Sequence, residues 1–283
     1  MRISIIMPSY NQSRFVEAAI QSVLSQEFND LEVLFIDGGS TDGTMDIVDK
    51  YRDRLALCIS ERDKGQSDAL HKGFCRATGD LVTWLNTDDL LLPGALFDVE
   101  RSAKADPECE WFLGNVMWID SGGGILRCRR GEAYAPLWPR LGLLTAAGPS
   151  AFFSRALYDR VGGINKNLNY QMDTELWWRF IISGARFRRL RDYTWALRLH
   201  AEAKVSGHLF QDKNDPQAII ASAAQMREAE HVNALRDSHL IDIGPAARRG
   251  AVLVKKALSP SYLRSITESR RWDGKRVNEV FGI

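Results

Sequence analysis

The residues best suited to metal chemistry lie in Asn86-Thr87-Asp88-Asp89, directly after the apolar run Leu81–Leu85. Carboxylates on a loop that follows a buried strand can hold Mg²⁺ or Mn²⁺, because these ions prefer oxygen ligands. One or two protein carboxylates plus substrate phosphates make the usual Mg²⁺ site. The same acids could instead cap the turn that leads to Pro93. The tetrapeptide alone therefore leaves the metal role and the capping role open.

A second polar cluster, Asp37-Gly-Gly-Ser-Thr-Asp-Gly-Thr44, contains glycines that permit a sharp turn and a close approach of a ligand to the backbone. Thr41 or Asp42 can cap the helix that follows. Asp37 stands at the strand tip without such a duty and can accept hydrogen bonds from a nucleobase. The cluster is not G-x-G-x-x-G and the chain has no Walker motif, which argues against a dinucleotide site and a P-loop.

The elements that position these clusters alternate between strands and helices. Apolar runs predict strands at Ile3–Met7, Glu32–Asp37, Ala56–Ser60 and Leu81–Leu85. Helical spacing predicts helices at Arg14–Gln26, Thr44–Tyr51 and Gln66–Ala77. Such alternation implies a mainly parallel sheet, whose ligands gather at the carboxyl ends of the strands. Because four successive strands end in polar residues, we expect one continuous rim that forms the site.

The second half of the chain has a less regular pattern. Strands are predicted at Trp111–Ile119, Ser150–Ser154, Arg186–Leu190 and Trp195–His200. Helices are predicted at Met172–Ser183, Pro216–Arg236, Ala246–Leu258 and Ser261–Ser269, the last two separated at Pro260.

Composition narrows the class of protein. The 283 residues are 45% hydrophobic and 26% charged, as in ordinary globular chains, and a net charge of +1 argues against a general nucleic-acid binder. Nine Lys/Arg against three acids give Gly244 to Ile283 a charge of +6, and the rest of the chain carries −5. The four cysteines are far apart, which favours reduced thiols. With no apolar run that would span a membrane, we expect a cytoplasmic protein.

Five blocks in order resemble a family 2 glycosyltransferase over about residues 3–205. They are Ser4-Ile-Ile-Met-Pro-Ser-Tyr-Asn11 with Ser22-Val-Leu-Ser-Gln26, Glu32 to Thr44, Gly79-Asp-Leu-Val-Thr-Trp-Leu-Asn-Thr-Asp-Asp89, Val161-Gly-Gly163 and Met172-Asp-Thr-Glu-Leu-Trp177. The resemblance implies a GT-A fold, an α/β architecture with a mainly parallel central sheet flanked by helices. The expected GT-A domain divides into a Rossmann-like nucleotide half (1–118) and an acceptor half (119–205). A basic helical extension (206–283) follows it.

The resemblance also implies roles for single residues around a nucleotide donor, commonly a UDP-sugar. Asp37 would read the base, and Asp88 matches the metal-binding second Asp of the family's D-x-D motif. Asn86 stands where the first Asp of that motif is common, and Leu70 where many members have a phosphate-contacting arginine. Asn86 brings one fewer negative charge, which implies either a weaker hold on the metal or a nucleotide-binding residue that only touches the ribose. With Leu70, this chain does without the phosphate-contacting arginine. The remaining residues expected around the nucleotide are Pro8, Ser9, Tyr10, Asp63 and Asp68.

Asp173 is the candidate catalytic base, at the start of a predicted helix whose dipole favours the ionised carboxylate. It resembles the aspartate that deprotonates the acceptor hydroxyl in inverting members. The alternative role is helix capping, and Glu175 is the reserve candidate. His200 is the candidate second metal ligand, and Lys204 can neutralise charge on the leaving group. A structural role for His200 stays open.

The function expected from the resemblance is transfer of a sugar from a nucleotide-diphosphate donor to a saccharide acceptor with inversion, assisted by Mn²⁺ or Mg²⁺. The acceptor can be linked to a polyprenyl diphosphate, and the basic tail can dock on an anionic membrane surface or form a solvated helical face. One rival is a nucleotidyltransferase, which needs a glycine-rich basic loop that Pro8-Ser9-Tyr10-Asn11 does not supply. The other rival is an inactive glycan- or nucleotide-binding scaffold on the same fold.

Overall fold

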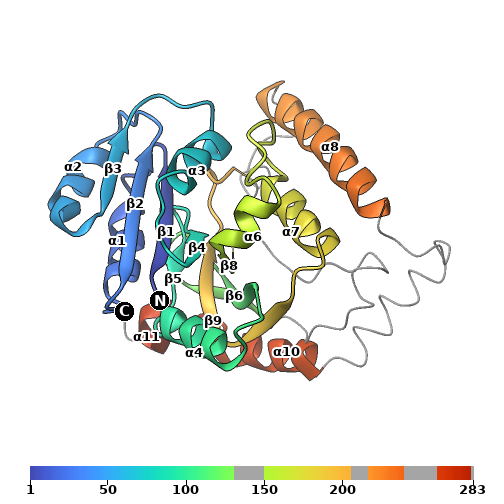
Figure 1. Ribbon diagram of the computed structural model, residues 1–283. Helices are drawn as coiled ribbons and strands as arrows, with labels where there is room; N and C mark the ends of the chain where they lie inside the picture. Colours follow the sequence, from blue (N-terminus) through green and yellow to red (C-terminus); the bar gives the residue numbers. More distant parts are fainter. Residues whose placement is uncertain (131–149, 205–215, 239–259, 282–283) are drawn as a thin grey trace.

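The computed structural model describes residues 1–130, 150–204, 216–238 and 260–281 (Figure 1). The strands are β1 (Ile3–Ser9), β2 (Leu31–Asp37), β3 (Leu57–Ser60), β4 (Leu81–Trp84), β5 (Leu90–Leu91), β6 (Trp111–Ile119), β7 (Ile125–Arg129), β8 (Ala151–Ser154) and β9 (Phe187–Arg198). The helices are α1 (Val16–Leu24), α2 (Thr44–Val48), the 3₁₀ helix η1 (Asp49–Arg54), α3 (Gln66–Phe74), α4 (Ala95–Ala105), α6 (Arg155–Arg160), α7 (Met172–Ile182), α8 (Pro216–Asp237), α10 (Pro260–Trp272) and α11 (Val277–Phe281).

The described strands form one sheet with the order β3-β2-β1-β4-β8-β6-β9-β5, and β7 pairs with β6. β3, β2, β1 and β4 are parallel to one another, as the strand–helix alternation predicts. β4 and β8 are antiparallel, so the run of parallel strands that starts at β3 ends at β4. The sheet continues without a break across both halves, and β6 spans the predicted boundary at residues 118 and 119. That boundary stays a prediction.

β1 lies in the middle of the parallel strands and is buried along its whole length. Ile3, Ile5 and Met7 belong to one apolar cluster, packed with Val16 and Ile20 of α1. Ile6 belongs to a second cluster that includes residues of α3 and α7. Because alternate side chains of a strand point to opposite faces, the run Ile3–Met7 can be buried on both sides only if helices cover both faces. This double cover holds the carboxyl end of β1 in place.

β9 corrects the prediction of two strands at Arg186–Leu190 and Trp195–His200, because it is one strand over Phe187–Arg198. Its pairing with β6 shifts register around Asn115. The Asn115 side-chain amide donates to the carbonyls of Leu190, Arg191 and Asp192, with N···O distances of 3.2, 2.9 and 2.9 Å. This irregularity interrupts the alternation of apolar residues, and so one strand has the sequence pattern of two.

The helices α10 and α11 pack against the body of the molecule. Ser265 and Ser269 of α10 accept hydrogen bonds from the backbone N–H groups of Arg130 and Cys128, at 2.7 and 2.9 Å. α10 begins at Pro260, where the sequence predicts a break, since proline is favoured in the first turn of a helix. The helix predicted at Ala246–Leu258 lies outside the described residues. In the described parts of the chain, no helix is long and apolar enough to cross a membrane.

Candidate active site

The polar clusters after β1, β2 and β4 meet at one edge of the sheet, as predicted. Ser9 is paired with Asp37 at the ends of β1 and β2, and the Gly38 N–H donates to the Ser9 carbonyl at 2.8 Å. Thr87 donates through its hydroxyl to the Pro8 carbonyl at 3.3 Å and to the Ser9 hydroxyl at 3.1 Å. Pro8 and Ser9 are buried at this edge, whereas Tyr10 is 62% exposed beside it.

Asp37 is fully buried and organises its own loop. One carboxylate oxygen accepts from the N–H groups of Gly39 and Ser40, at 3.0 and 2.9 Å, and from the Ser60 hydroxyl at 2.6 Å. The other oxygen accepts from the Ser40 hydroxyl at 2.5 Å. Asp37 does not cap α2, but it holds its own loop, a structural role that the sequence did not indicate. Its predicted contact with a base stays a prediction.

Asp63 lies against the loop at Gly38, next to the tip of β2. A Cβ placed on Gly38 would stand 2.8 Å from Asp63 Oδ2. Asp63 Oδ1 accepts from the Gly65 N–H at 2.8 Å. Burial raises the pKa of Asp63 above its ordinary value. Glycine at position 38 thus leaves room for a carboxylate from the following segment, close to where the sequence expects the base.

Asn86 and Asp68 both have partners within the protein. The Asn86 side chain accepts from Gln66 Nε2 at 2.6 Å and donates to Asp89 Oδ2 at 3.2 Å. Asp68 accepts from the Lys64 N–H at 3.2 Å and lies 3.6 Å from the Lys72 ammonium. Despite partial burial, these bonds and the Lys72 charge keep the pKa of Asp68 below its ordinary value. The predicted places of both residues around the nucleotide stay predictions.

Asp88 and His200 come together from segments 112 residues apart, with Asp88 Oδ2 3.1 Å from His200 Nε2. Within the described chain, no group of three or more His, Cys, Asp or Glu side chains could hold a metal ion. Two neighbouring ligands on an octahedral shell of about 2.1 Å radius stand about 3 Å apart, so this pair fits two positions of one ion. Substrate phosphates and water would complete such a shell. The pair therefore fits Mn²⁺ or Mg²⁺ bound together with a diphosphate.

Asp89 and Arg198 hold this pair in position, roles that the sequence did not indicate. Asp89 is buried and accepts from the Arg198 backbone N–H at 2.9 Å. Arg198 Nε donates to the Asp88 carbonyl at 2.8 Å. Burial, and then the charge of Asp88, raise the pKa of Asp89 well above its ordinary value. These contacts join the end of β9, two residues before His200, to the segment Asn86–Asp89, which we call the metal loop after its predicted role.

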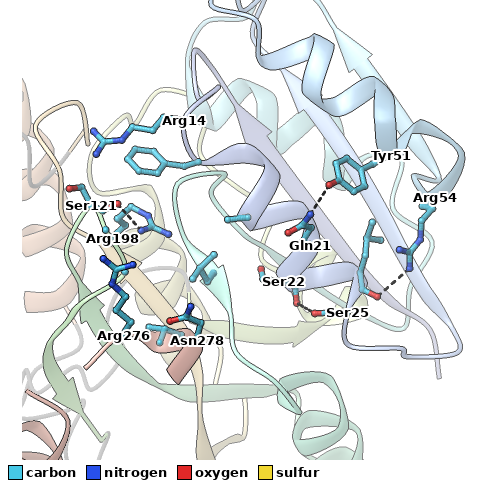
Figure 2. Close-up of a pocket in the computed structure, with 17 residues that line it drawn as sticks. Arg14, Gln21, Ser22, Ser25, Tyr51, Arg54, Ser121, Arg198, Arg276 and Asn278 are labelled. Carbon is cyan, nitrogen blue, oxygen red and sulfur yellow. Dashed lines mark hydrogen bonds between the residues drawn. The ribbon is translucent and has the colours of Figure 1, made fainter. Parts of the chain in front are cut away.

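A cavity of about 700 Å³ lies on the side of α1, behind the metal loop (Figure 2). Arg14, Arg198 and Arg276 lie at one end of it, and Gln21, Tyr51 and Arg54 at the other. Phe15, at the same end as Arg14, packs against the His200 ring with centroids 4.7 Å apart. The aromatic contact fixes the orientation of the imidazole from behind.

Asp173 lies in the first turn of α7, as predicted. Its Oδ1 accepts from the Thr174 N–H at 2.6 Å and from the Thr174 hydroxyl at 3.2 Å. Burial raises the pKa of Asp173 above its ordinary value, an effect opposed by these hydrogen bonds and by the charge of Lys204. A carboxylate with a raised pKa is suited to accept a proton near neutral pH.

Glu175, the reserve candidate, is committed to a structural ion pair. Its two oxygens accept from Arg179 Nε and Nη2 at 2.8 and 2.7 Å, and the residue is 5% exposed. Arg179 also donates to the carbonyls of Val161 and Gly163 at 2.6 Å. The block Val161-Gly-Gly163 is thus tied to α7. Trp177, next in the family pattern, is core and stacks between Trp84 and Trp111.

Lys204 and Gln66 form a hydrogen-bonded chain to Asn86, and the charges of Lys204 and Asp173 influence each other. Lys204 Nζ donates to Gln66 Oε1 at 3.3 Å, and the other end of the Gln66 amide donates to Asn86. Although Lys204 keeps exposed surface, crowding of protein around its ammonium lowers its pKa to about 8. The nearby carboxylates of Glu228, Asp173 and Asp63 oppose that shift. The sequence named Lys204, but nothing in it indicated Gln66 or Glu228.

Comparison with known proteins gives relatives of this chain in sequence and in fold. The sequence model of Glycosyl transferase family 2 matches residues 4–162. The chain is 34% identical over 107 residues to a GalNAc(5)-diNAcBac-PP-undecaprenol beta-1,3-glucosyltransferase of Campylobacter jejuni, covering 36% of the chain and 35% of that relative. Other matched segments span 31% of one curated glycosyltransferase and 58% of two others, so the chain corresponds to part of these relatives.

Two kinds of solved structure share the fold. S. aureus TarS 1-349 in complex with UDP-GlcNAc superposes with a TM-score of 0.63 and 17% identity, over 99% of the chain and 84% of the TarS 1-349 chain. The mannosyltransferase PcManGT from Pyrobaculum calidifontis, in complex with GDP-Man and Mn²⁺, gives a TM-score of 0.56 and 20% identity, over 96% and 84%. The fold is GT-A, as predicted. With more than half of its length matched by the family's sequence model, the chain belongs to glycosyl transferase family 2.

Proposed function

We propose that the protein transfers a sugar from a nucleotide-diphosphate donor, UDP-linked, to a hydroxyl group of a saccharide acceptor with inversion at the anomeric carbon. The observation that carries this proposal is the Gln66 bridge, which links Asn86 on the metal loop to Lys204 beside Asp173. A glycosyl transfer needs a group that stabilises the leaving diphosphate and a base for the acceptor proton. This bridge supports the proposal that both act in one site.

Each residue has a defined task in the transfer. Asp173 accepts the proton of the acceptor hydroxyl as that oxygen attacks the anomeric carbon, and the diphosphate leaves on the opposite side. Lys204, still largely protonated at pH 7 with a pKa of about 8, offsets charge on the departing diphosphate. Asp88 and His200 would hold Mn²⁺ or Mg²⁺, which supplies further positive charge to the diphosphate. Asp89 and Arg198 keep those two ligands aligned.

The nucleotide lies, in this proposal, over the edge formed by Pro8, Ser9 and Tyr10, bordered by Asp68. Asp63 is better placed than Asp37 to accept a hydrogen bond from the base. Asp63 Oδ2 has no protein donor among the described residues, whereas both oxygens of Asp37 are occupied by its own loop. UDP is favoured because the similar TarS structure holds UDP-GlcNAc. The GDP-Man in PcManGT makes GDP-sugars the next donors to test.

The acceptor is proposed to be a lipid-linked saccharide used in polysaccharide synthesis, since the Campylobacter relative is named for an undecaprenol-linked substrate. A cytoplasmic protein docked on the membrane through its basic C-terminal segment would meet such an acceptor. In α10, which belongs to the described part of that segment, Arg264, Arg270 and Arg271 are exposed. Sedimentation with phosphatidylglycerol vesicles, but not with phosphatidylcholine vesicles, would support this docking. Equal binding to both would contradict it.

The decisive experiment measures release of the nucleoside diphosphate from a panel of UDP-, GDP- and dTDP-sugars with Mn²⁺, Mg²⁺ or EDTA. We expect slow metal-dependent hydrolysis of one UDP-sugar, faster with the correct acceptor. Asp88→Ala should abolish this metal-dependent hydrolysis. Asp173→Asn should lower turnover by about 10²-fold or more while it still binds UDP. Binding of UDP and metal without any turnover by the wild type would instead support the inactive scaffold.

A further inference from the structure

Glu228 of α8 contacts the segment that leads into α7. Its Oε1 accepts from the Asn169 N–H at 2.7 Å, and its Oε2 accepts from the N–H groups of Tyr170 and Gln171 at 2.6 and 2.9 Å. Asn169 and Glu228 are 59 residues apart in the chain. α7 and α8 lie side by side in Figure 1 and are in contact. A carboxylate that satisfies three successive backbone donors fixes the path of that segment.

These backbone groups stand directly before the candidate base. Gln171 is the N-cap residue of α7, and its side chain makes no capping hydrogen bond. The first N–H groups of a helix lack partners within the helix, and so an acceptor from elsewhere must satisfy them. Glu228 supplies that acceptor at Gln171, two residues before Asp173. The position of the base therefore depends on a side chain from the C-terminal part of the chain.

Glu228 also acts on Lys204 by charge. The titratable groups around the Lys204 ammonium are Glu228, Asp173 and Asp63, while Gln66 accepts its hydrogen bond and the Tyr170 ring lies 5.5 Å from it. Of the three carboxylates, Glu228 favours the charged ammonium most. Tyr170, whose N–H is bound by Glu228, belongs to the segment that Glu228 fixes. The same carboxylate therefore influences both the base and the cation.

α8 packs against the rest of the protein on the same face that carries Glu228. Val232, one turn after Glu228, is 4% exposed, whereas Glu230 is exposed on another face. Since i and i+4 residues of a helix share a face, Glu228 and Val232 face the body of the molecule together. A carboxylate held on an anchored face loses little freedom when it binds the segment before α7.

From this geometry we propose that Glu228 is a positioning residue of the transfer reaction, which aligns Asp173 through the segment Asn169–Gln171. This inference rests on the proposed function for its catalytic part. It makes α8 a component of the active site and not an appendage to it. Its structural part, the bond between Glu228 and the segment, can be tested whether or not the enzyme assay succeeds.

The experiment compares the full-length wild type with Glu228→Gln, Glu228→Asp and the matched surface control Glu230→Gln. Hydrogen exchange in the segment Asn169–Gln171 should be faster in Glu228→Gln by about tenfold or more and unchanged in Glu230→Gln. For donor turnover we expect kcat to fall by about ten- to a hundredfold in Glu228→Gln, with the KM for the donor within about twofold. Glu228→Asp should recover part of the loss.

The pH profile of kcat distinguishes a specific effect of Glu228 on the active site from a general loss of folding. Because Glu228 raises the pKa of Lys204, its removal should move the alkaline limb of kcat to a lower pH than in the wild type. Unchanged exchange in Glu228→Gln would overturn the proposal. So would unchanged kcat and an unchanged alkaline limb in a variant whose exchange is faster. An inactive wild type with faster exchange in Glu228→Gln would overturn the proposed function and leave the structural part supported.

Discussion

At the scale of single residues, Asp37 and Asp63 near the tip of β2 differ in how much of their hydrogen-bonding capacity remains for a ligand. Asp37 is fully buried with both oxygens bonded within its loop. Asp63 lies beside Gly38 with one oxygen bonded to the Gly65 N–H. Loss of charge at the buried Asp37 would leave several donors of its loop without a strong acceptor, which lowers stability. Loss of charge at Asp63 would mainly weaken the binding of a ligand. The two should therefore respond differently to the same substitution.

We expect Asp63→Asn to weaken UDP binding by about tenfold or more with little change in stability. Asp37→Asn should lower the free energy of unfolding by about 1–3 kcal/mol, because an amide has a single acceptor oxygen and cannot accept from both the Ser40 and the Ser60 hydroxyls. Calorimetric titration with UDP and urea denaturation measure the two effects. The assignment fails if Asp63→Asn binds UDP as tightly as the wild type does.

Asp173 predicts the acid limb of the activity. Burial raises its pKa, and a general base acts only when it is deprotonated. We therefore expect kcat/KM for transfer to fall as the pH drops through a pKa above the ordinary 3.8 of an aspartate. A pH series from 4 to 9 with saturating metal measures this limb. Substitution of the exposed Asp159 by Asn is the control, and an acid limb at or below 3.8 would argue against Asp173 as the base.

At the scale of elements, β9 determines where His200 lies. The strand runs beside β6 through a change of register and ends at Arg198, two residues before the imidazole. Asn115 fills the irregularity with its amide donors, which face the carbonyls of residues 190–192. Without that amide, the carbonyls would be buried with fewer partners, or the strand would shift. The local geometry of β9 thus links a core asparagine to the metal site.

Asn115→Asp replaces the amide donor with an oxygen that faces those carbonyls, and we expect a loss of about 2–4 kcal/mol in the free energy of unfolding. Asn115→Ala should cost less, about 1–3 kcal/mol, since it removes the donor without adding an acceptor. Urea denaturation at pH 7 measures both losses. The same change at the exposed Asn167, Asn167→Asp, should fall within about 0.5 kcal/mol of the wild type.

At the scale of the whole molecule, α10 and α11 pack against β5, β6, β7 and β9, at the end of the sheet opposite β3. Glu268 of α10 accepts from Arg130 Nε at 2.8 Å and from the Tyr193 hydroxyl at 2.5 Å. Burial would raise the pKa of Glu268, but these bonds and the Arg130 charge outweigh it and hold the pKa below its ordinary value. Such a carboxylate stabilises the fold above its unfolded pKa and loses this effect as the pH falls through the folded pKa.

Glu268→Gln should therefore be less stable than the wild type at pH 7, by about 1–2 kcal/mol. The difference should shrink as the pH falls below about 4.5, the ordinary pKa of a glutamate. Urea denaturation at pH 7, 5 and 3.5 measures it, with Asp273→Asn at the exposed end of α10 as the control. A difference that stays constant over this range would show that Glu268 does not contribute through its charge.

The sequence alone determined the parallel half of the sheet, the edge where its strands end and the family to which the chain belongs. These follow from local information, since apolar runs, helical spacing and polar strand ends are written within each short segment. It also placed Asp173 at the start of a helix and named Asp88 with His200. Only the tertiary structure brought those two to 3.1 Å and showed that Asp37 serves its own loop, while Asp63 lies beside Gly38 with one oxygen bonded to the Gly65 N–H. Gln66 and Glu228 emerged in the same way, because a contact between residues 20 or 59 positions apart leaves no local pattern. The roles of such residues depend on how strands and helices pack, and packing is a property of the whole chain.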